Sequence, residues 1–195
     1  MSHISPLTNI HLKGQFGNYE NKSERDLLKI SEINNLLIVQ IVQYKNSSIQ
    51  LENLKIDNLN FKDVSLSVSN NDNTRILWNA PKCWLLVSTK NELIKEIEEK
   101  FDEMNFAVTD LSHSRAIIEL EGDQSKEVLK KGCPFNFNKF NKNNCLNSTF
   151  NGITVTVDML NDSPLKVRIF SLRSFGESLY HSISDSCLEY GYKGV

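Results

Sequence analysis

The sequence predicts an α+β fold, in which antiparallel sheets bury one face under amphipathic helices. Two observations predict it. Pairs of strand-like runs are followed by a helix-like segment three times between residues 75 and 191. The helix-like segments also place their apolar residues on one side. The chain has 195 residues, a length that suits one domain or two small lobes sharing a core.

The first unit begins with two strand-like runs, at residues 75–79 and 84–88. Pro81 lies between them, and its ring presets a turn dihedral and removes a donor that a strand ladder would need. These residues predict a hairpin.

A helix is expected directly after this hairpin. Thr89 and Glu92 have the spacing of a capping box, which satisfies two free amides at a helix start. Glu96 and Lys100 are spaced for an ion pair on one side of that helix. Its apolar face consists of Leu93, Ile94, Ile97 and Phe101.

The same order of elements recurs in the second unit. Residues 106–110 and 115–121 are strand-like and predict a second hairpin. A short helix is expected to begin at Gly122 and to run through Lys131. Gly132 then stands where a left-handed C-terminal cap would fall.

The third unit has the clearest periodicity. Apolar and polar residues alternate over 153–159 and again over 165–169, with a turn at 161–164 between them. Ser174 and Glu177 form another capping box. The following helix ends near Gly191. Its apolar residues recur at steps of four: Phe175, Leu179, Ile183 and Cys187.

The N-terminal part of the chain has weaker signals. Residues 1–30 are polar and predict an extended arm with little core of its own, which either frays or lies on a partner. Residues 31–195 are expected to form the α+β domain, with any division into two lobes near 75–110. Residues 36–42 predict a strand, and the mixed region that follows predicts one short strand at 64–68.

Composition excludes several classes of protein. The chain has 22 Lys and Arg against 24 Asp and Glu, a net charge of −2. We therefore expect neither nucleic-acid nor membrane-surface binding, which need clustered positive charge. The longest apolar run, 36–42, is too short to span a membrane. The opening residues Met1 to Leu7 lack a secretory signal, so a cytoplasmic location is expected.

The sequence contains no familiar cofactor motif. Gly-rich phosphate loops, HExxH and GxSxG are all absent, and the scattered cysteines form no CxxC pair or zinc-ligand spacing. Free, buried thiols are therefore expected at Cys83, Cys133, Cys145 and Cys187. We expect no catalytic, cofactor-binding or metal-binding residue in this chain.

The segment from Asp110 to Arg115 could carry chemistry, because it holds a carboxylate, an imidazole, a guanidinium and two hydroxyls. Asp110 could orient His113 as a base for Ser112. The segment joins two strands, however, and Asp and Ser are ordinary turn residues there. Adjacent strand residues also point to opposite faces. We favour the structural interpretation.

Two further features have a structural and a functional interpretation. Cys133 follows the C-terminus of a predicted helix, whose partial negative charge disfavours a thiolate, so a buried thiol is favoured over a nucleophile. Trp78 and Trp84 flank a turn and could stack on a planar ligand. Cross-strand packing is the simpler interpretation.

Several segments, in this order along the chain, resemble the gamma subunit of heterotetrameric sarcosine oxidase. The similarity covers most of the chain and is strongest between residues 75 and 190. The segments are SPL at 5–7, RILWNAP at 75–81, WLL at 84–86, VTDLSHSRAIIELEG at 108–122, VLKKGCP at 128–134 and SFGESL at 174–179.

The resemblance implies a fold related to the folate-binding aminomethyltransferase of the glycine cleavage system. It also implies a complex of alpha, beta, gamma and delta subunits that oxidatively demethylates sarcosine to glycine with hydrogen peroxide and transfers the one-carbon unit to tetrahydrofolate. In such complexes FAD, FMN, NAD and the folate site belong to the alpha and beta subunits, and zinc belongs to delta. A gamma chain is then a non-catalytic assembly subunit, with alpha as its main contact.

Two alternatives remain open from the residues. The first is a free-standing folate-binding protein of the YgfZ and aminomethyltransferase superfamily. The Lys131-Gly132-Cys133 triplet resembles the YgfZ-type pattern, but Pro134 breaks the match after three residues. The second is an unrelated small hydrolase that uses His113 or Cys133.

Overall fold

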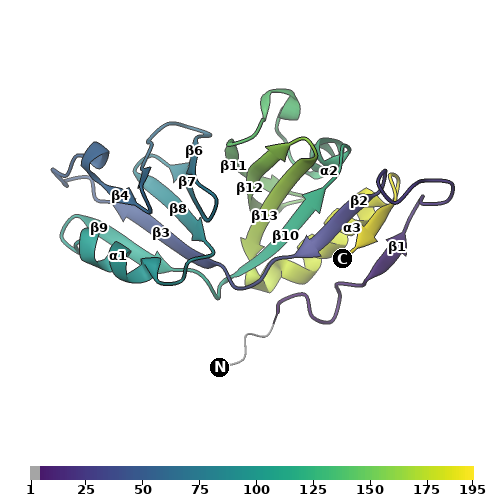
Figure 1. Ribbon diagram of the computed structural model, residues 1–195, viewed down its shortest axis with the longest axis horizontal. Helices are drawn as coiled ribbons and strands as arrows, with labels where there is room; N and C mark the ends of the chain where they lie inside the picture. The colour runs from purple at the N-terminus through teal and green to yellow at the C-terminus, as the bar shows by residue number, and fades with distance from the viewer. Residues whose placement is uncertain (1–4) are drawn as a thin grey trace. The chain divides into compact units, whose positions relative to one another are not determined.

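The computed structural model describes residues 5–195 and divides the chain into two compact units (Figure 1). The first unit contains residues 5–34, 114–142 and 146–195, and the second contains 35–113 and 143–145. All of residues 75–110, where the sequence placed the division between lobes, therefore lie inside the second unit.

The first unit is built on a seven-stranded sheet with the strand order β1-β14-β2-β10-β13-β12-β11. Neighbouring strands from β2 through β10 and β13 to β12 pair antiparallel, whereas β14 runs parallel to β2. The elements are β1 (Gly14–Phe16), β2 (Leu28–Glu32), β10 (Arg115–Glu121), α2 (Ser125–Gly132), β11 (Cys145–Phe150), β12 (Ile153–Asp162), β13 (Leu165–Leu172), α3 (Gly176–Cys187) and β14 (Tyr192–Gly194), with 3-10 turns η2 (Phe137–Lys139) and η3 (Arg173–Phe175).

Helices α2 and α3 cover one face of this sheet (Figure 1). Alternating residues of β10, β12 and β13 supply the apolar floor, and Val128, Leu179 and Ile183 of the helices pack on it. This arrangement confirms the predicted α+β class, because a sheet with one apolar face is covered by amphipathic helices.

The second unit has a five-stranded sheet with the order β6-β7-β8-β3-β9, and a separate two-stranded ribbon of β4 and β5. Helix α1 packs on the sheet through Leu93 and Ile97. The elements are β3 (Leu37–Gln43), η1 (Leu51–Asn53), β4 (Lys55–Ile56), β5 (Leu59–Asn60), β6 (Val68–Asn70), β7 (Thr74–Ala80), β8 (Cys83–Ser88), α1 (Leu93–Lys100) and β9 (Phe106–Asp110).

Two of the three predicted hairpins are confirmed, and one is wrong. Strand β7 pairs with β8, and β12 pairs with β13. Strand β9, in contrast, pairs with β3 in the second unit, while β10 pairs with β2 and β13 in the first. Residues 111–114 are thus a connection between units rather than a hairpin turn. Local sequence cannot distinguish the two, because both need a short polar link between strands.

The predicted helix starts are also corrected. Helix α1 begins at Leu93 and α3 at Gly176, and neither N-cap residue makes a side-chain capping bond. Thr89 instead donates its hydroxyl to Asn73 Oδ1 at 3.3 Å. Ser174 belongs to the turn η3. The predicted strand at 64–68 is displaced as well, because Leu66 has a positive φ of 64° and β6 starts at Val68.

Gly132 is a glycine for a different reason from the one predicted. It ends α2 without the left-handed cap, and the next residue, Cys133, is extended with φ −104° and ψ 126°. A Cβ atom at Gly132 would lie 2.8 Å from ring atoms of buried Phe150 in β11. The small residue therefore permits a close approach of helix and strand, which no local motif reveals.

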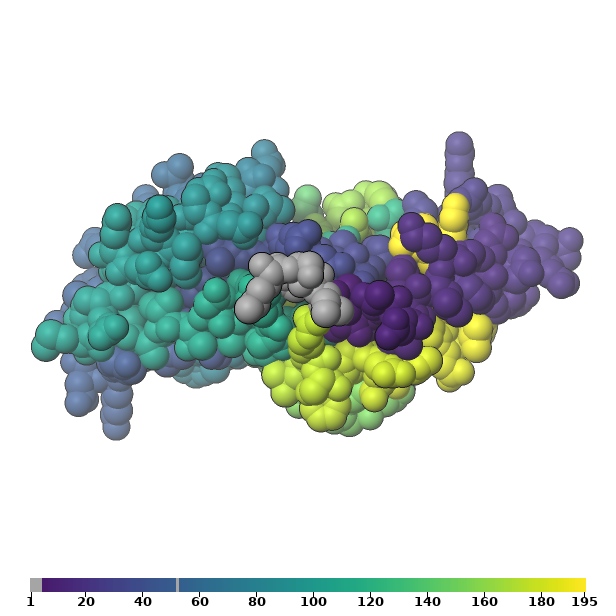
Figure 2. All heavy atoms as spheres, turned by 90° about the horizontal axis from the view of Figure 1, so that it is seen from below, coloured from purple at the N-terminus to yellow at the C-terminus, as the bar shows by residue number. Residues whose placement is uncertain are grey.

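The segment expected to be an extended arm, residues 1–30, packs on the first unit from residue 5 onward; residues 1–4 lie outside the described chain. Leu7 is fully buried, and β1 pairs with β14. Figure 2 shows this segment in dark purple beside the yellow C-terminal residues. At Gly17, φ is +75° and an added Cβ would lie 2.4 Å from Leu188 O. Deleting the arm would therefore remove core and sheet edge from this unit.

Candidate functional site

The segment from Asp110 to Arg115 forms a hydrogen-bonded turn at the end of β9. Ser112 donates both its backbone N–H and its hydroxyl to Asp110 Oδ1, at 2.8 and 2.6 Å. The Ser112 hydroxyl also accepts a hydrogen bond from the Ile38 amide at 3.0 Å. These bonds attach the connection to β3. They give the serine the role of a turn residue, in agreement with the structural interpretation.

The four cysteines are free and buried, which confirms the predicted thiols. Burial raises the pKa of Cys133 to about 11 and that of Cys187 to about 12. A thiol with so high a pKa is almost entirely protonated at neutral pH and is a poor nucleophile. The geometry therefore does not favour the hydrolase interpretation of Cys133.

The two tryptophans lie directly opposite each other on β7 and β8. Trp84 is fully buried, and its indole N–H donates to Lys62 O. Its ring packs edge-on against the ring of Phe61, with 5.6 Å between the ring centroids. Trp78 is half-buried and donates to Asp63 Oδ1 at 2.8 Å. Each indole N–H is thus paired within the protein, which supports a packing role rather than ligand stacking.

Among the residues that the structure describes, no group of three or more His, Cys, Asp or Glu side chains is arranged to hold a metal ion. No helix in this part of the chain is long and apolar enough to cross a membrane.

A buried ionic cluster lies in the first unit. Glu119 on β10 accepts hydrogen bonds from Arg168 Nε at 2.9 Å and from the same guanidinium's Nη2, and Lys166 Nζ lies 2.7 Å from its other oxygen. Burial pushes the pKa of Glu119 up, but the two cations outweigh it, so the pKa lies below the usual range. The carboxylate is ionised and fully partnered, as a structural ion pair requires.

A second ionic cluster ties the β4–β5 ribbon to the larger sheet of the second unit. Asp57 lies 2.7 Å from Lys90 Nζ and accepts hydrogen bonds from the Thr74 hydroxyl at 2.6 Å and from the Asn71 amide at 3.0 Å. The bonds from Lys90 and Thr74 lower the pKa of Asp57 to about 2. Local pairing alone would leave a ribbon of two residues per strand unstable.

Replacing Asp57 with Asn is expected to lower the free energy of unfolding by roughly 2 kcal/mol at pH 7, since hydrogen bonds to a charged group are lost. Because the pKa of Asp57 is depressed in the folded chain, its ionised carboxylate stabilises the fold at pH values above the unfolded-state pKa of 3.8. This contribution is lost as the pH falls through the folded-state pKa of about 2. The difference between the two proteins should therefore shrink between pH 4 and pH 2 in urea titrations.

Glu96→Gln is the control for this experiment, because Glu96 pairs with Lys100 on the exposed surface of α1 at 2.6 Å. An exposed i,i+4 pair contributes only about 0.5 kcal/mol. Equal losses from the two substitutions would contradict the assigned role of Asp57.

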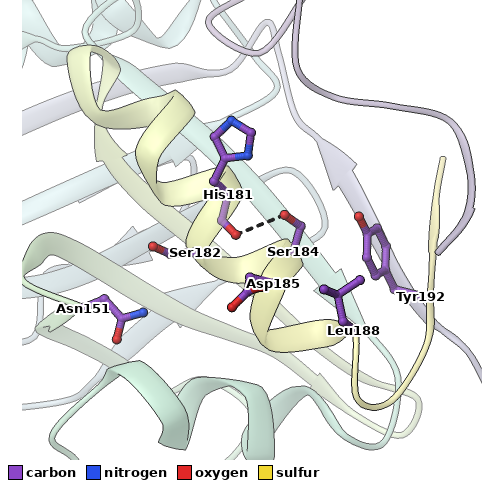
Figure 3. Close-up of a pocket in the computed structure, with 7 residues that line it drawn as sticks. All are labelled: Asn151, His181, Ser182, Ser184, Asp185, Leu188 and Tyr192. Carbon is purple, nitrogen blue, oxygen red and sulfur yellow. Dashed lines mark hydrogen bonds between the residues drawn. The ribbon is translucent and has the colours of Figure 1, made fainter. Parts of the chain in front are cut away.

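An open hollow of about 520 Å³ runs beside α3 (Figure 3). Ser182, Ser184 and Asp185 of the helix line it, with Asn151 on one side and Tyr192 of β14 on the other. Its lining is mostly polar, and Ser184 already donates its hydroxyl to His181 O at 3.1 Å. Ligand sites are usually more enclosed and more apolar.

A groove of about 400 Å³ lies between α1 and β9 in the second unit. We call it the α1–β9 groove. Its apolar lining comes from Ile94 and Phe101 on the helix side and from Phe106 and Val108 on the strand. Its charged lining consists of Glu98, Glu103 and Asp110. The sequence predicted the strand and the helix face separately, but nothing in it indicated that β9 would be an edge strand.

Comparison with solved structures defines the class of fold. The chain is similar to the glycine cleavage system aminomethyltransferase T from Bartonella henselae, with a TM-score of 0.58 and 13% identity over 82% of this chain and 46% of that chain. At this identity the likeness concerns the fold alone, and it confirms the predicted aminomethyltransferase-like architecture.

A second structure is similar over nearly the whole chain. It is the heterotetrameric sarcosine oxidase from Corynebacterium sp. U-96 in complex with pyrrole 2-carboxylate. The TM-score is 0.81 at 21% identity, over 96% of this chain and 95% of that chain. In sequence, sarcosine oxidase subunit gamma from Corynebacterium sp. (strain U-96) is 28% identical over 120 residues, 60% of this chain and 58% of that protein.

The family model described as "Sarcosine oxidase, gamma subunit family" matches residues 56–187. The chain therefore belongs to the sarcosine oxidase gamma subunit family.

Proposed function

We propose that this chain is the non-catalytic gamma subunit of a cytoplasmic heterotetrameric sarcosine oxidase. The complex oxidatively demethylates sarcosine to glycine with hydrogen peroxide and transfers the one-carbon unit to tetrahydrofolate. The observation that carries the proposal is the family match over residues 56–187. The similarity in fold to a chain of a heterotetrameric sarcosine oxidase supports it.

In this proposal the reaction occurs on the other subunits. The alpha and beta subunits bind FAD, FMN, NAD and tetrahydrofolate, and delta binds zinc. The gamma chain contributes surface, mainly to alpha, and contacts neither nucleic acid nor membrane. The bonded Ser112 hydroxyl and the buried, protonated cysteines are compatible with that role, because neither offers a ready nucleophile.

Co-expression of the tagged full-length chain with the alpha, beta and delta subunits of the same organism tests the proposal. We expect the tag to capture all four chains together with bound flavin, and the captured complex to produce hydrogen peroxide from sarcosine. The chain purified alone should produce none.

Two results would contradict this function. One is sarcosine oxidation by the chain alone, measured against the same preparation after heat treatment. The other is tight, stoichiometric binding of tetrahydrofolate to the isolated chain in calorimetry, which a free-standing folate-binding protein would show.

A further inference from the structure

Strand β9 has an open edge. It is the last strand of its sheet and pairs only with β3 among the strands that the structure describes. Natural edge strands are usually protected by lysine, proline or a bulge. The residues of β9, Phe-Ala-Val-Thr-Asp, include no lysine or proline, and its register with β3 is uninterrupted.

The register identifies which backbone groups face outward. The Leu111 amide donates to Ile38 O at 2.7 Å, and the Tyr44 amide donates to Asn105 O at 2.9 Å. In an antiparallel pair, every second residue of a strand turns both its N–H and its C=O toward the partner strand. Asn105 and Leu111 are such residues, so the N–H and C=O groups of Ala107 and Thr109, between them, also face β3. The N–H and C=O of Val108 therefore point away from the sheet.

The open edge and the α1–β9 groove coincide. Side chains alternate along a strand, so Phe106, Val108 and Asp110 share one face. All three line the groove. The Phe106 amide already donates to Asp102 O at 2.9 Å, so the outward backbone groups of Val108 are the ones that an added strand would pair with in mid-strand. A strand added to β9 would therefore pair with the Val108 backbone and place every second side chain beside Val108 and Ile94, the partly exposed apolar residues of the groove, as in β-strand addition. Phe101 and Phe106 are buried, at 3% and 2% exposure.

The charges along the groove specify the chemistry of its occupant. Glu98, Glu103 and Asp110 line it, and the described lining contains no lysine or arginine. Met104, next to Glu103 in the chain, is 89% exposed. An occupant needs apolar side chains for the floor and cationic side chains for the rim, because like charges would repel it.

We propose that the α1–β9 groove docks an extended segment of the large partner subunit. The segment adds a strand to the edge of β9 and carries lysine or arginine between apolar residues. This inference rests on the proposed function and specifies the surface through which the gamma subunit joins the complex.

Val108→Pro tests the added strand. Proline removes the outward N–H but leaves the ladder between β9 and β3, which uses Ala107 and Thr109, so the chain should keep its circular dichroism spectrum. Its melting temperature should fall by only a few degrees, through the lost packing of the partly buried Val108 side chain. Capture of the alpha subunit by the full-length chain, in the complete four-subunit co-expression, should weaken roughly tenfold.

Glu98→Lys tests whether the negative charge of the groove attracts the docked segment. This test leaves the backbone hydrogen bonds of β9 unchanged. Reversal of this charge should weaken capture roughly fivefold and reduce the salt dependence of binding. Glu99→Lys is the matched control, because it makes the same change on the same helix at a residue outside the groove lining. It should change capture by less than about twofold.

The outcomes separate this inference from the proposed function. If the unmodified chain captures alpha, and Val108→Pro and Glu98→Lys capture it equally well, the docking surface is wrong while the function stands. If the unmodified chain captures no alpha, both are wrong. If the isolated chain forms a dimer that Val108→Pro abolishes, the occupant is a second copy and the inference is overturned.

Discussion

Replacing Trp84 with alanine is expected to lower the free energy of unfolding of the second unit by roughly 3–5 kcal/mol. The side chain is fully buried and packs in one cluster with Phe61, Ile97 and Phe106. Alanine would leave a large cavity, and Lys62 O would lose the hydrogen bond from the indole. Chemical denaturation followed by far-UV circular dichroism measures the loss.

Trp78→Ala provides the matched control, since Trp78 lies directly opposite Trp84. This side chain is only half-buried, so its removal should cost about 1–2 kcal/mol. Similar losses for the two tryptophans would show that the packing does not depend on Trp84 as we have described.

Replacing Arg168 with methionine is expected to destabilise the first unit by roughly 3 kcal/mol at pH 7. The substitution keeps most of the side-chain volume but leaves the Glu119 carboxylate, only 5% exposed, with Lys166 as its remaining cation. Asp158, also buried, is the register partner of Arg168 on β12. Urea unfolding measures the difference.

The pH dependence gives this prediction a second measurement. Glu119 has a lowered pKa in the folded chain, so its pairing stabilises the fold above the unfolded value of 4.5 and is lost as the pH falls through the folded value. The difference between the parent and Arg168→Met should therefore be largest near neutral pH and decline below about pH 4.

Lys166→Met is the control, because Lys166 pairs with the same carboxylate from a more exposed position, 35% against 16% for Arg168. We expect a loss near 1 kcal/mol, since solvent screens an exposed charge. Equal losses from both substitutions would refute the assignment of Arg168 as the principal partner of Glu119.

Where periodicity is strong, the sequence was sufficient to predict the elements. Alternation over 153–159 and 165–169 predicts the β12–β13 hairpin, and the four-residue spacing from Leu179 to Cys187 predicts the buried face of α3. Such patterns are local consequences of side-chain geometry. The buried cysteines were predictable for a similar reason, because free thiols are among the most buried groups.

The failures concern pairing between distant segments. The short polar link between β9 and β10 has the composition of a hairpin turn, yet the strands join different sheets. The N-terminal segment has little apolar periodicity, yet β1 and β2 enter the sheet by pairing with β14. These pairings involve backbone groups, which every residue type carries and which leave little trace in the sequence.

The α1–β9 groove illustrates the same limit for the candidate site. The sequence predicted strand 106–110 and the apolar helix face containing Ile94 and Phe101. The two elements that supply the groove's apolar residues were therefore both predicted. It did not indicate that Phe106 and Val108 would lie on an edge strand. That depends on β3 pairing with β9 on one side and β8 on the other.

By itself, the amino-acid sequence determined the fold class, most helices and strands, the buried thiols and the resemblance to the gamma subunits. Tertiary structure alone decided the division into units, the place of the N-terminal segment and the open edge of β9. The physical reason is that propensity and periodicity act between near neighbours, whereas strand order depends on contacts between residues far apart in the chain.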